Sequence, residues 1–329
     1  MNPMNPIALA ANRPAERFYR GGERLRAFRG DQGVAPREPE DWVGSVTTVR
    51  GEEALGLTTL PDGRLLRDAI AEDPVAWLGE EHVDRWSDDA QLLVKLLDAG
   101  ERLPVHAHPH DDFAAGHLGR AHGKAEAWYI LEGGTVHVAL REDVTAEALA
   151  DLVARQDVAA LLGLLHAIEV GPGDVVWVPP GELHAIGAGV LLLELQQPED
   201  LSILLEWDGF AIDGPGEGHL GLGFDLALTA VNRAGRDRAD LDALVRRAPR
   251  SGSVLPAAAD EYFRLDRIPV DGETLALDPG FAIVVVVDGE IALGAQRFPV
   301  GSTVLVPAAA SVRVLTGRGE ALIARPPAP

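Results

Sequence analysis

The apolar residues of this chain fall into short runs that end at glycine or proline, and this pattern restricts the fold more than any other feature. Such runs cover residues 92–97, 175–178, 282–287 and 302–306. Short apolar runs bounded by turn residues are typical of buried strands, and 36 glycines and 23 prolines supply many turns. The runs do not alternate with long helical segments, which argues against a parallel doubly wound sheet. The sequence therefore predicts a mainly β fold, either a sandwich or a jelly-roll barrel.

Two helical patterns interrupt the strands. Apolar residues recur at helical spacing over residues 145–165, after a threonine that can cap the helix, and over roughly residues 223–247. A stretch rich in serine, proline and alanine at 251–259 is the best candidate for a linker. We therefore expect a larger domain over residues 1–250, which carries both helical insertions, and a smaller domain over 256–329.

Two separated motifs contain four side chains that suit a metal ion. Residues two apart on a strand point to the same face, so His106 and His108 can chelate one ion. Glu126 lies in a second predicted strand, and His184 follows the turn Pro179-Pro180-Gly181. A lone pair of histidines on a strand is more often structural, but four ligands at matched spacings on separate strands favour a metal site. Three imidazoles and one carboxylate suit Zn²⁺, Mn²⁺, Fe²⁺ or Co²⁺ and leave positions open for water or substrate.

The charge of the chain argues against two classes of partner. The formal net charge is −22, which repels phosphate backbones and anionic lipid, so we expect neither a nucleic-acid nor a membrane partner. Six basic residues cluster early, and they are expected to form a solvated or ion-paired face unless one or two reach an anionic or polyhydroxy ligand. They are Arg13, Arg17, Arg20, Arg24, Arg26 and Arg29.

The absence of cysteine excludes disulfides, thiolate metal ligands and a cysteine nucleophile. The apolar stretch at residues 7–11 is too short for a secretory signal, and no run approaches the roughly 18 apolar residues that span a bilayer. A cytoplasmic location is the default expectation. The sequence does not indicate which oligomeric state the protein adopts.

In the spacing of glycine, histidine, glutamate and proline, the two motifs resemble those of the cupin superfamily, whose members fold as jelly rolls. The residues around them are similar to the type I mannose-6-phosphate isomerases over roughly residues 15–210. That similarity lies in the segments 92–95, 108–112, 123–131, 179–187 and 193–197. The resemblance implies two cupin domains, the second of which lacks the metal motif.

The resemblance also implies a zinc-dependent isomerase that moves a proton between C1 and C2 of a sugar or sugar phosphate. It assigns the metal to His106, His108, Glu126 and His184, although the first ligand is normally glutamine in that family. Lys124 matches a residue associated with the substrate phosphate.

Two positions depart from the family pattern. Pro104 stands where the family has a phosphate-binding serine, and Leu204 stands where it has a catalytic arginine. Neither side chain can donate a hydrogen bond. The substrate can therefore be mannose 6-phosphate or a related, unphosphorylated sugar.

A side chain in the pocket has to move the proton, and the candidates are Glu194, Asp112 and His110, with Lys124 and Lys95 as electrostatic stabilisers. Two other functions remain open. Three histidines and one glutamate also serve oxygen-using cupins with iron or copper, and a protein without the arginine could bind a sugar and not convert it.

Overall fold

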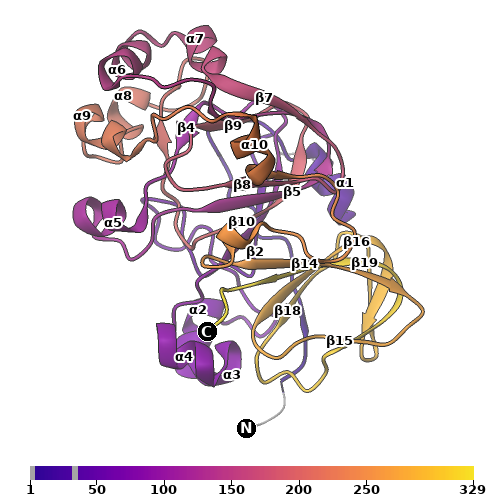
Figure 1. The fold of residues 1–329 in the computed structure, drawn as a ribbon. Coiled ribbons are helices and arrows are strands. Elements are labelled where there is room, and N and C mark those ends of the chain that lie inside the picture. The colour runs from indigo at the N-terminus through magenta and orange to yellow at the C-terminus, as the bar shows by residue number, and fades with distance from the viewer. Residues whose placement is uncertain (1–3, 32–35) are drawn as a thin grey trace.

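Three antiparallel sheets form the framework of the computed structural model, which describes residues 4–31 and 36–329 (Figure 1). The mainly β prediction is confirmed. The first sheet has six strands, and their spatial order is β12 (Val245–Arg246), β8 (Val175–Val178), β5 (Glu126–Glu132), β10 (Leu191–Gln196), β3 (Leu93–Asp98) and β2 (Glu40–Val43). The second has five strands, in the order β11 (Ile203–Leu204), β4 (His106–Ala107), β9 (His184–Ile186), β6 (Gly134–Leu140) and β7 (Leu165–Val170).

The register of the six-stranded sheet brings charged side chains together on one face. Glu194 of β10 lies opposite Lys95 of β3 and Trp128 of β5, and Lys95 lies opposite Trp42 of β2. Directly opposed residues share a face of the sheet. Glu126 lies two residues before Trp128 and therefore points to the same side.

The five-stranded sheet has a corresponding row, which contains two of the histidines. His106 of β4 is opposite His184 of β9 on one side and Leu204 of β11 on the other. Glu126 from the first sheet approaches His184 from the second, with Oε2 3.5 Å from Nε2. The two polar rows therefore face each other in the interior of a two-sheet sandwich.

The third sheet is formed mainly by the C-terminal part of the chain. Its main path runs β1 (Ile7–Ala8), β18 (Thr303–Val306), β16 (Ala282–Leu293), β19 (Val314–Arg325), β14 (Arg264–Asp271) and β13 (Gly252–Ser253), with β15 (Leu275–Ala276) beside β19 and β17 (Gln296–Pro299) beside β16. One hydrophobic cluster includes Trp177 of β8 together with Ile283 and Leu322, so this sheet packs on the six-stranded one. The division into domains at 1–250 and 256–329, and their assignment as two cupin units, stay predictions.

Short helices cover the edges of the sheets. They are α1 (Glu23–Arg29), α2 (Leu66–Glu72), α3 (Pro74–Leu78), α4 (Glu80–Trp86), α5 (Asp111–Phe113), α6 (Ala146–Arg155), α7 (Val158–Gly163), α8 (Gly214–Glu217), α9 (Phe224–Ala227) and α10 (Arg238–Leu244). Figure 1 shows α6 to α9 gathered over the end of the molecule that holds β4 and β9. Within the described ranges, no helix is long and apolar enough to cross a membrane.

The two ranges expected to be helical differ in outcome. Residues 145–165 hold α6 and α7, and Thr145 caps α6 by accepting a hydrogen bond from the Ala148 N–H at 3.2 Å. Residues 223–247 instead hold α9, a 3₁₀ turn and α10, separated by an extended segment. Gly235 in that segment lies so close to the chain that an added Cβ would come within 2.6 Å of the Glu142 Cα. The chain before α10 thus runs against residues 140–144 and is not helical.

Candidate metal centre

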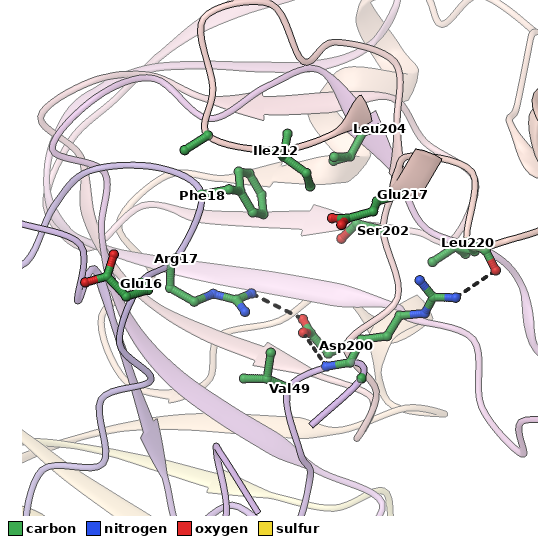
Figure 2. Close-up of a pocket in the computed structure, with 13 residues that line it drawn as sticks. Glu16, Arg17, Phe18, Val49, Asp200, Ser202, Leu204, Ile212, Glu217 and Leu220 are labelled. Atoms are coloured by element: carbon green, nitrogen blue, oxygen red, sulfur yellow. Dashed lines mark hydrogen bonds and ion pairs between the residues drawn. The ribbon is translucent and has the colours of Figure 1, made fainter. Parts of the chain in front are cut away.

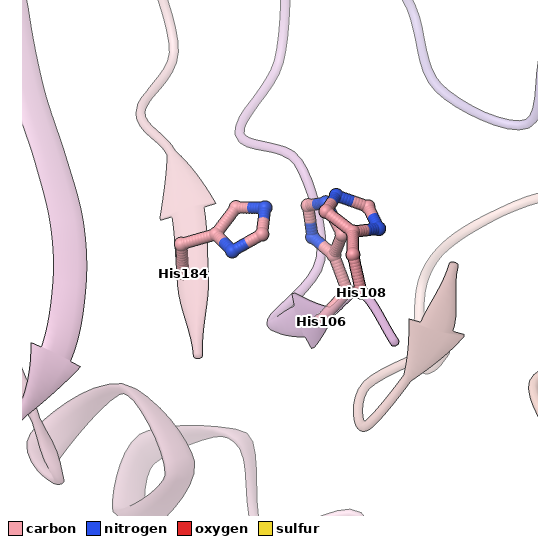
Figure 3. A group of neighbouring side chains, drawn as sticks. All are labelled: His106, His108 and His184. Carbon is pink, nitrogen blue, oxygen red and sulfur yellow. The ribbon is translucent and has the colours of Figure 1, made fainter. Parts of the chain in front are cut away.

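Three buried imidazoles meet between the two facing sheets (Figure 3). His106 lies on β4, His108 follows directly after this strand, and His184 begins β9. One ring nitrogen of each lies within 4.8 Å of the ligand atoms of the other two. The structure thus brings together three of the four residues expected to bind metal, from two regions far apart in sequence.

The surroundings of the rings fix which nitrogen is free. Each Nδ1 donates to a backbone carbonyl: His106 to Pro104 at 2.9 Å, His108 to Leu201 at 2.6 Å and His184 to Glu182 at 2.9 Å. The Nε2 lone pairs are then available to a cation, as is usual for histidine ligands. The Nε2 of His184 is buried and has no hydrogen-bond partner among the described residues. The residues present therefore fit a bound metal ion.

Burial keeps these rings neutral. It lowers the pKa of His184 to about 3 and that of His108 to about 4, and it holds the pKa of His106 well below its usual range. A neutral imidazole is the form that binds a metal. At neutral pH no proton has to leave these rings first.

Glu126, the fourth residue expected to bind metal, approaches two of the histidines from the opposite sheet. Its Oε1 lies 3.0 Å from His108 Nε2, and its Oε2 lies 3.5 Å from His184 Nε2. Burial alone would raise the pKa of this carboxyl, but the Lys124 ammonium beside it holds the pKa well below its usual range. The Lys124 ammonium lies 2.6 Å from Glu126 Oε1 and 3.3 Å from His108 Nε2. Lys124 therefore supplies positive charge beside two of the expected ligands.

A second buried carboxylate lies near the first. Glu194 accepts a hydrogen bond from Trp128 Nε1 at 3.2 Å, and its other oxygen lies 3.8 Å from Lys95 Nζ. Burial, with a further contribution from Glu126, raises the pKa of Glu194 to about 8. Lys95 does not reach the surface, since only 2% of it is exposed and its ammonium lies 4.5 Å from the centre of the Trp42 ring. Glu194 thus has a pKa close to neutrality in a buried site, as a proton-transfer group requires.

Two connected cavities lead to this cluster. The inner one is small, about 40 Å³, and is lined by His106, Lys124, Glu126 and Glu194 among others. The outer one, about 620 Å³, opens to the surface (Figure 2). Five residues line both cavities and so form the neck between them, namely Arg17, Phe18, Asp200, Ser202 and Leu204. The outer volume is in the range of small-molecule sites.

The remaining expected site residues lie elsewhere. Asp112 is exposed on α5, and His110 is exposed just before this helix. Neither lines the inner or the outer cavity. The two positions that depart from the family pattern do lie at the site, because Pro104 lines the inner cavity and Leu204 lines both.

A buried ionic network lies beside the three histidines, and the sequence pattern indicated only part of it. Glu40 of β2 accepts hydrogen bonds from Tyr19 Oη and Trp42 Nε1, both at 2.6 Å, and lies 3.8 Å from Lys95 Nζ. Burial alone would raise the pKa of Glu40, but Arg17 and Lys95 lower it to about 2. The early arginine cluster was the only signal, and it did not say which arginine points inward. Two others are paired with different carboxylates, since the half-exposed Arg24 is near Asp98 and the buried Arg26 is paired with Glu38.

Comparison with known proteins assigns the chain to a family. “Probable mannose-6-phosphate isomerase GmuF” of Bacillus subtilis is 32% identical over 193 residues, which cover 56% of this chain and 56% of that protein. “Putative mannose-6-phosphate isomerase YvyI” of the same organism is 31% identical over 220 residues, which cover 64% of this chain and 67% of that protein. The chain belongs to the mannose-6-phosphate isomerase family. No family model matches it.

Solved structures agree in fold with this family. Mannose 6-phosphate isomerase from Bacillus subtilis superimposes with a TM-score of 0.76 at 24% identity, over 98% of this chain and all of that one. A point mutant of phosphomannose isomerase from Salmonella typhimurium gives a TM-score of 0.76 at 16% identity, over 99% of this chain and all of that one. The mannose-6-phosphate isomerase fold therefore extends over nearly the whole chain, whereas the sequence matches to GmuF and YvyI span 56% and 67% of those relatives.

Proposed function

We propose that this protein is a metal-dependent aldose–ketose isomerase that converts mannose 6-phosphate to fructose 6-phosphate or acts on a closely related sugar. The observation that carries the proposal is the buried cluster of three imidazoles, with the Nε2 of His184 unpartnered and Glu126 beside it. We assign the metal to His106, His108, Glu126 and His184, and we propose Zn²⁺ as the ion. Family membership supports the reaction class.

The metal, when bound, supplies a Lewis acid that polarises the carbonyl and hydroxyl oxygens at C1 and C2. Glu194 is our candidate for the group that moves the proton, because it lines the inner cavity and its pKa is raised to about 8. Trp128 holds one of its oxygens by a hydrogen bond. Lys95 and Lys124 bring positive charge to the same cavity, where it stabilises an enediolate.

A second substrate class has one observation in its favour. Pro104 and Leu204 line the inner cavity, and neither offers a donor to a phosphate. An unphosphorylated aldose is therefore our second candidate substrate.

The test is a panel of free and phosphorylated aldoses, assayed with protein that has been stripped of metal and reloaded with Zn²⁺, Mn²⁺, Co²⁺ or Fe²⁺. We expect ketose formation only in the reloaded samples. Turnover of mannose 6-phosphate at an ordinary kcat/KM of roughly 10⁴ M⁻¹s⁻¹ or more would rule out the unphosphorylated substrate as the main one.

The same samples separate the other functions that the site allows. Oxygen uptake in the iron-loaded protein, without ketose formation, would indicate an oxygenase. Thermal stabilisation by the sugar without turnover in any sample would indicate a sugar-binding protein. Either result would overturn the isomerase proposal.

A further inference from the structure

One buried arginine lies at the neck between the two cavities. Arg17 lines both, and 12% of its side chain is exposed (Figure 2). Its Nε donates a hydrogen bond to Glu40 Oε1 at 3.3 Å, and its Nη2 lies 3.5 Å from Asp200 Oδ1. Glu40 belongs to β2 and Asp200 to the segment before β11, so two carboxylates from different elements fix the direction of the guanidinium.

The arginine has donors to spare. A guanidinium carries five N–H groups in a fixed plane. The contacts with Glu40 and Asp200 involve Nε and Nη2, and Nη1 has no hydrogen bond to any of the described residues. A ligand that enters the neck can therefore accept hydrogen bonds from Arg17 without displacing Glu40.

The other residues of the neck make this donor necessary. Leu204 lies opposite His106 in the register of the five-stranded sheet, so it occupies the place beside the metal cluster and offers no polar group. Pro104, which lines the inner cavity, also lacks a side-chain donor. Besides Arg17, the neck offers the Ser202 hydroxyl, the Asp200 carboxylate and the apolar side chains of Phe18 and Leu204. Arg17 is the cationic donor where the two cavities join.

The size of the cavities fixes which part of a sugar reaches this point. The inner cavity, at about 40 Å³, has room for only about three water-sized groups, so most of a hexose has to lie in the outer cavity of about 620 Å³. The carbons that react must approach Glu194 and the metal cluster through the neck. The oxygen atoms on these carbons therefore come close to Arg17.

We propose that Arg17 is a substrate-contacting catalytic residue, which donates hydrogen bonds to the sugar oxygen that becomes negative during proton transfer. This inference rests on the isomerase function proposed above. When a carboxylate takes the proton from the carbon beside the carbonyl, the C–H electron pair forms the C=C bond of the enediolate. The carbonyl oxygen takes the negative charge and then receives the proton of the neighbouring hydroxyl. The carboxylic acid returns its proton to the former carbonyl carbon as the C=C bond is lost, and the oxygen that gave up its proton becomes the new carbonyl. A planar guanidinium near that oxygen stabilises the charge.

In this proposal the charge-stabilising arginine lies on the N-terminal segment, and Leu204 of β11 lies beside the three histidines. Leu204 and Arg17 line the same neck, so an arginine introduced at position 204 can reach the same ligand. The role of the guanidinium can therefore be tested by moving it from position 17 to position 204.

The experiment compares four proteins, each reloaded with Zn²⁺ and assayed with mannose 6-phosphate: wild type, Arg17→Lys, Arg17→Lys with Leu204→Arg, and Arg26→Lys. Lysine keeps the charge that Glu40 and Asp200 require and loses the planar fork. Arg26→Lys is the matched control, because Arg26 is a buried, ion-paired arginine of the same N-terminal segment that lines neither cavity. Thermal unfolding is recorded for all four.

We expect Arg17→Lys to lower kcat by about 100-fold with a much smaller change in KM, because the contact strengthens in the transition state. Arg26→Lys should keep the wild-type kcat. Leu204→Arg should restore kcat at least about tenfold in the Arg17→Lys background without raising its Tm, which separates contact with the substrate from a structural role.

Wild-type kcat and KM in the folded Arg17→Lys protein would overturn this inference and leave the isomerase function standing. If Arg17→Lys lowers both Tm and kcat, and Leu204→Arg restores neither, Arg17 is structural and the inference is wrong. Absence of turnover in the wild type would instead count against the proposed function itself.

Discussion

At the scale of single residues, the candidate site is prepared by contacts behind the ligands. Three backbone carbonyls each accept a hydrogen bond from the Nδ1 of one histidine, and one of these carbonyls belongs to Pro104. The proline that cannot bind a phosphate thus helps to orient His106. One ring nitrogen of each of His106, His108 and His184 lies within 4.8 Å of those of the other two.

His184→Ala tests this arrangement. The variant removes the most deeply buried imidazole, so we expect the affinity for Zn²⁺ to fall by more than about 100-fold. Elemental analysis after dialysis and isomerase turnover measure the loss. His117→Ala is the control, because His117 is exposed on the turn after α5. Equal zinc content in the two variants would contradict the assignment of His184.

Glu194→Gln tests the proton-transfer group. The change is nearly isosteric and removes the acid–base function, so we expect kcat to fall by about 10²- to 10⁴-fold while zinc content stays unchanged. Asp112→Asn is the comparison, because Asp112 was the other carboxylate candidate and is exposed outside both cavities. A larger loss of kcat in Asp112→Asn than in Glu194→Gln would contradict the assignment of Glu194.

At the scale of elements, the positions of the strands could be predicted far better than the contacts between their charged side chains. The alternation of side chains and the position of His106 and His108 followed from the sequence, and the structure keeps both on one face beside His184. Glu194 and Lys95 were expected in the pocket, but the buried row that they form with Glu40 on the six-stranded sheet could not be predicted. Its members come from β2, β3 and β10, and only the register between these strands shows that Glu40, Lys95 and Glu194 lie together.

The same limit explains the second helical range. Local spacing over residues 223–247 favoured a helix, whereas the structure has an extended segment paired with residues 140–144. The Val144 N–H donates to the Arg233 carbonyl, and the Arg236 N–H donates to the Leu140 carbonyl. These contacts join residues about 90 positions apart, and local periodicity does not report them.

The ionic row in β2 has a consequence for pH dependence. The pKa of Glu40 falls from its ordinary 4.5 to about 2, so its contribution to stability is complete above pH 4.5 and is lost as the pH falls toward 2. A shift of this size corresponds to roughly 3 kcal/mol. In metal-free protein, Glu40→Gln should therefore lower the free energy of unfolding strongly at pH 7 and much less at pH 3.

Urea unfolding at the two pH values measures this difference, and Glu72→Gln provides the control, since its carboxylate is 65% exposed. The free energy of unfolding of the Glu72 variant should follow the wild type at both pH values. An equal loss of stability at pH 7 and pH 3 in Glu40→Gln would show that packing, and not ionisation, determines the effect.

At the scale of the whole molecule, an ion bound at the proposed site would join two sheets. Its expected ligands come from β4 and β9 on one sheet and from β5 on the other, so a bound ion adds a link across the sandwich. Ligand binding to the folded state alone raises stability by mass action.

Removal of the metal should therefore lower Tm. At an ion concentration of about 100 times Kd the stabilisation is about 2.7 kcal/mol, which corresponds to a Tm change of about 4 °C for a chain of this size. Calorimetry of chelated and reloaded protein measures the change. His184→Ala serves as the control, since its Tm should not respond to zinc.

The most direct test of the central claim is ketose formation from mannose 6-phosphate by one preparation, measured as purified, after chelation and after reloading with Zn²⁺. The account predicts that chelation abolishes turnover and that stoichiometric zinc restores it in the wild type but not in His184→Ala. Undiminished turnover by the metal-free protein, or no ketose with any of the four metals, would contradict it.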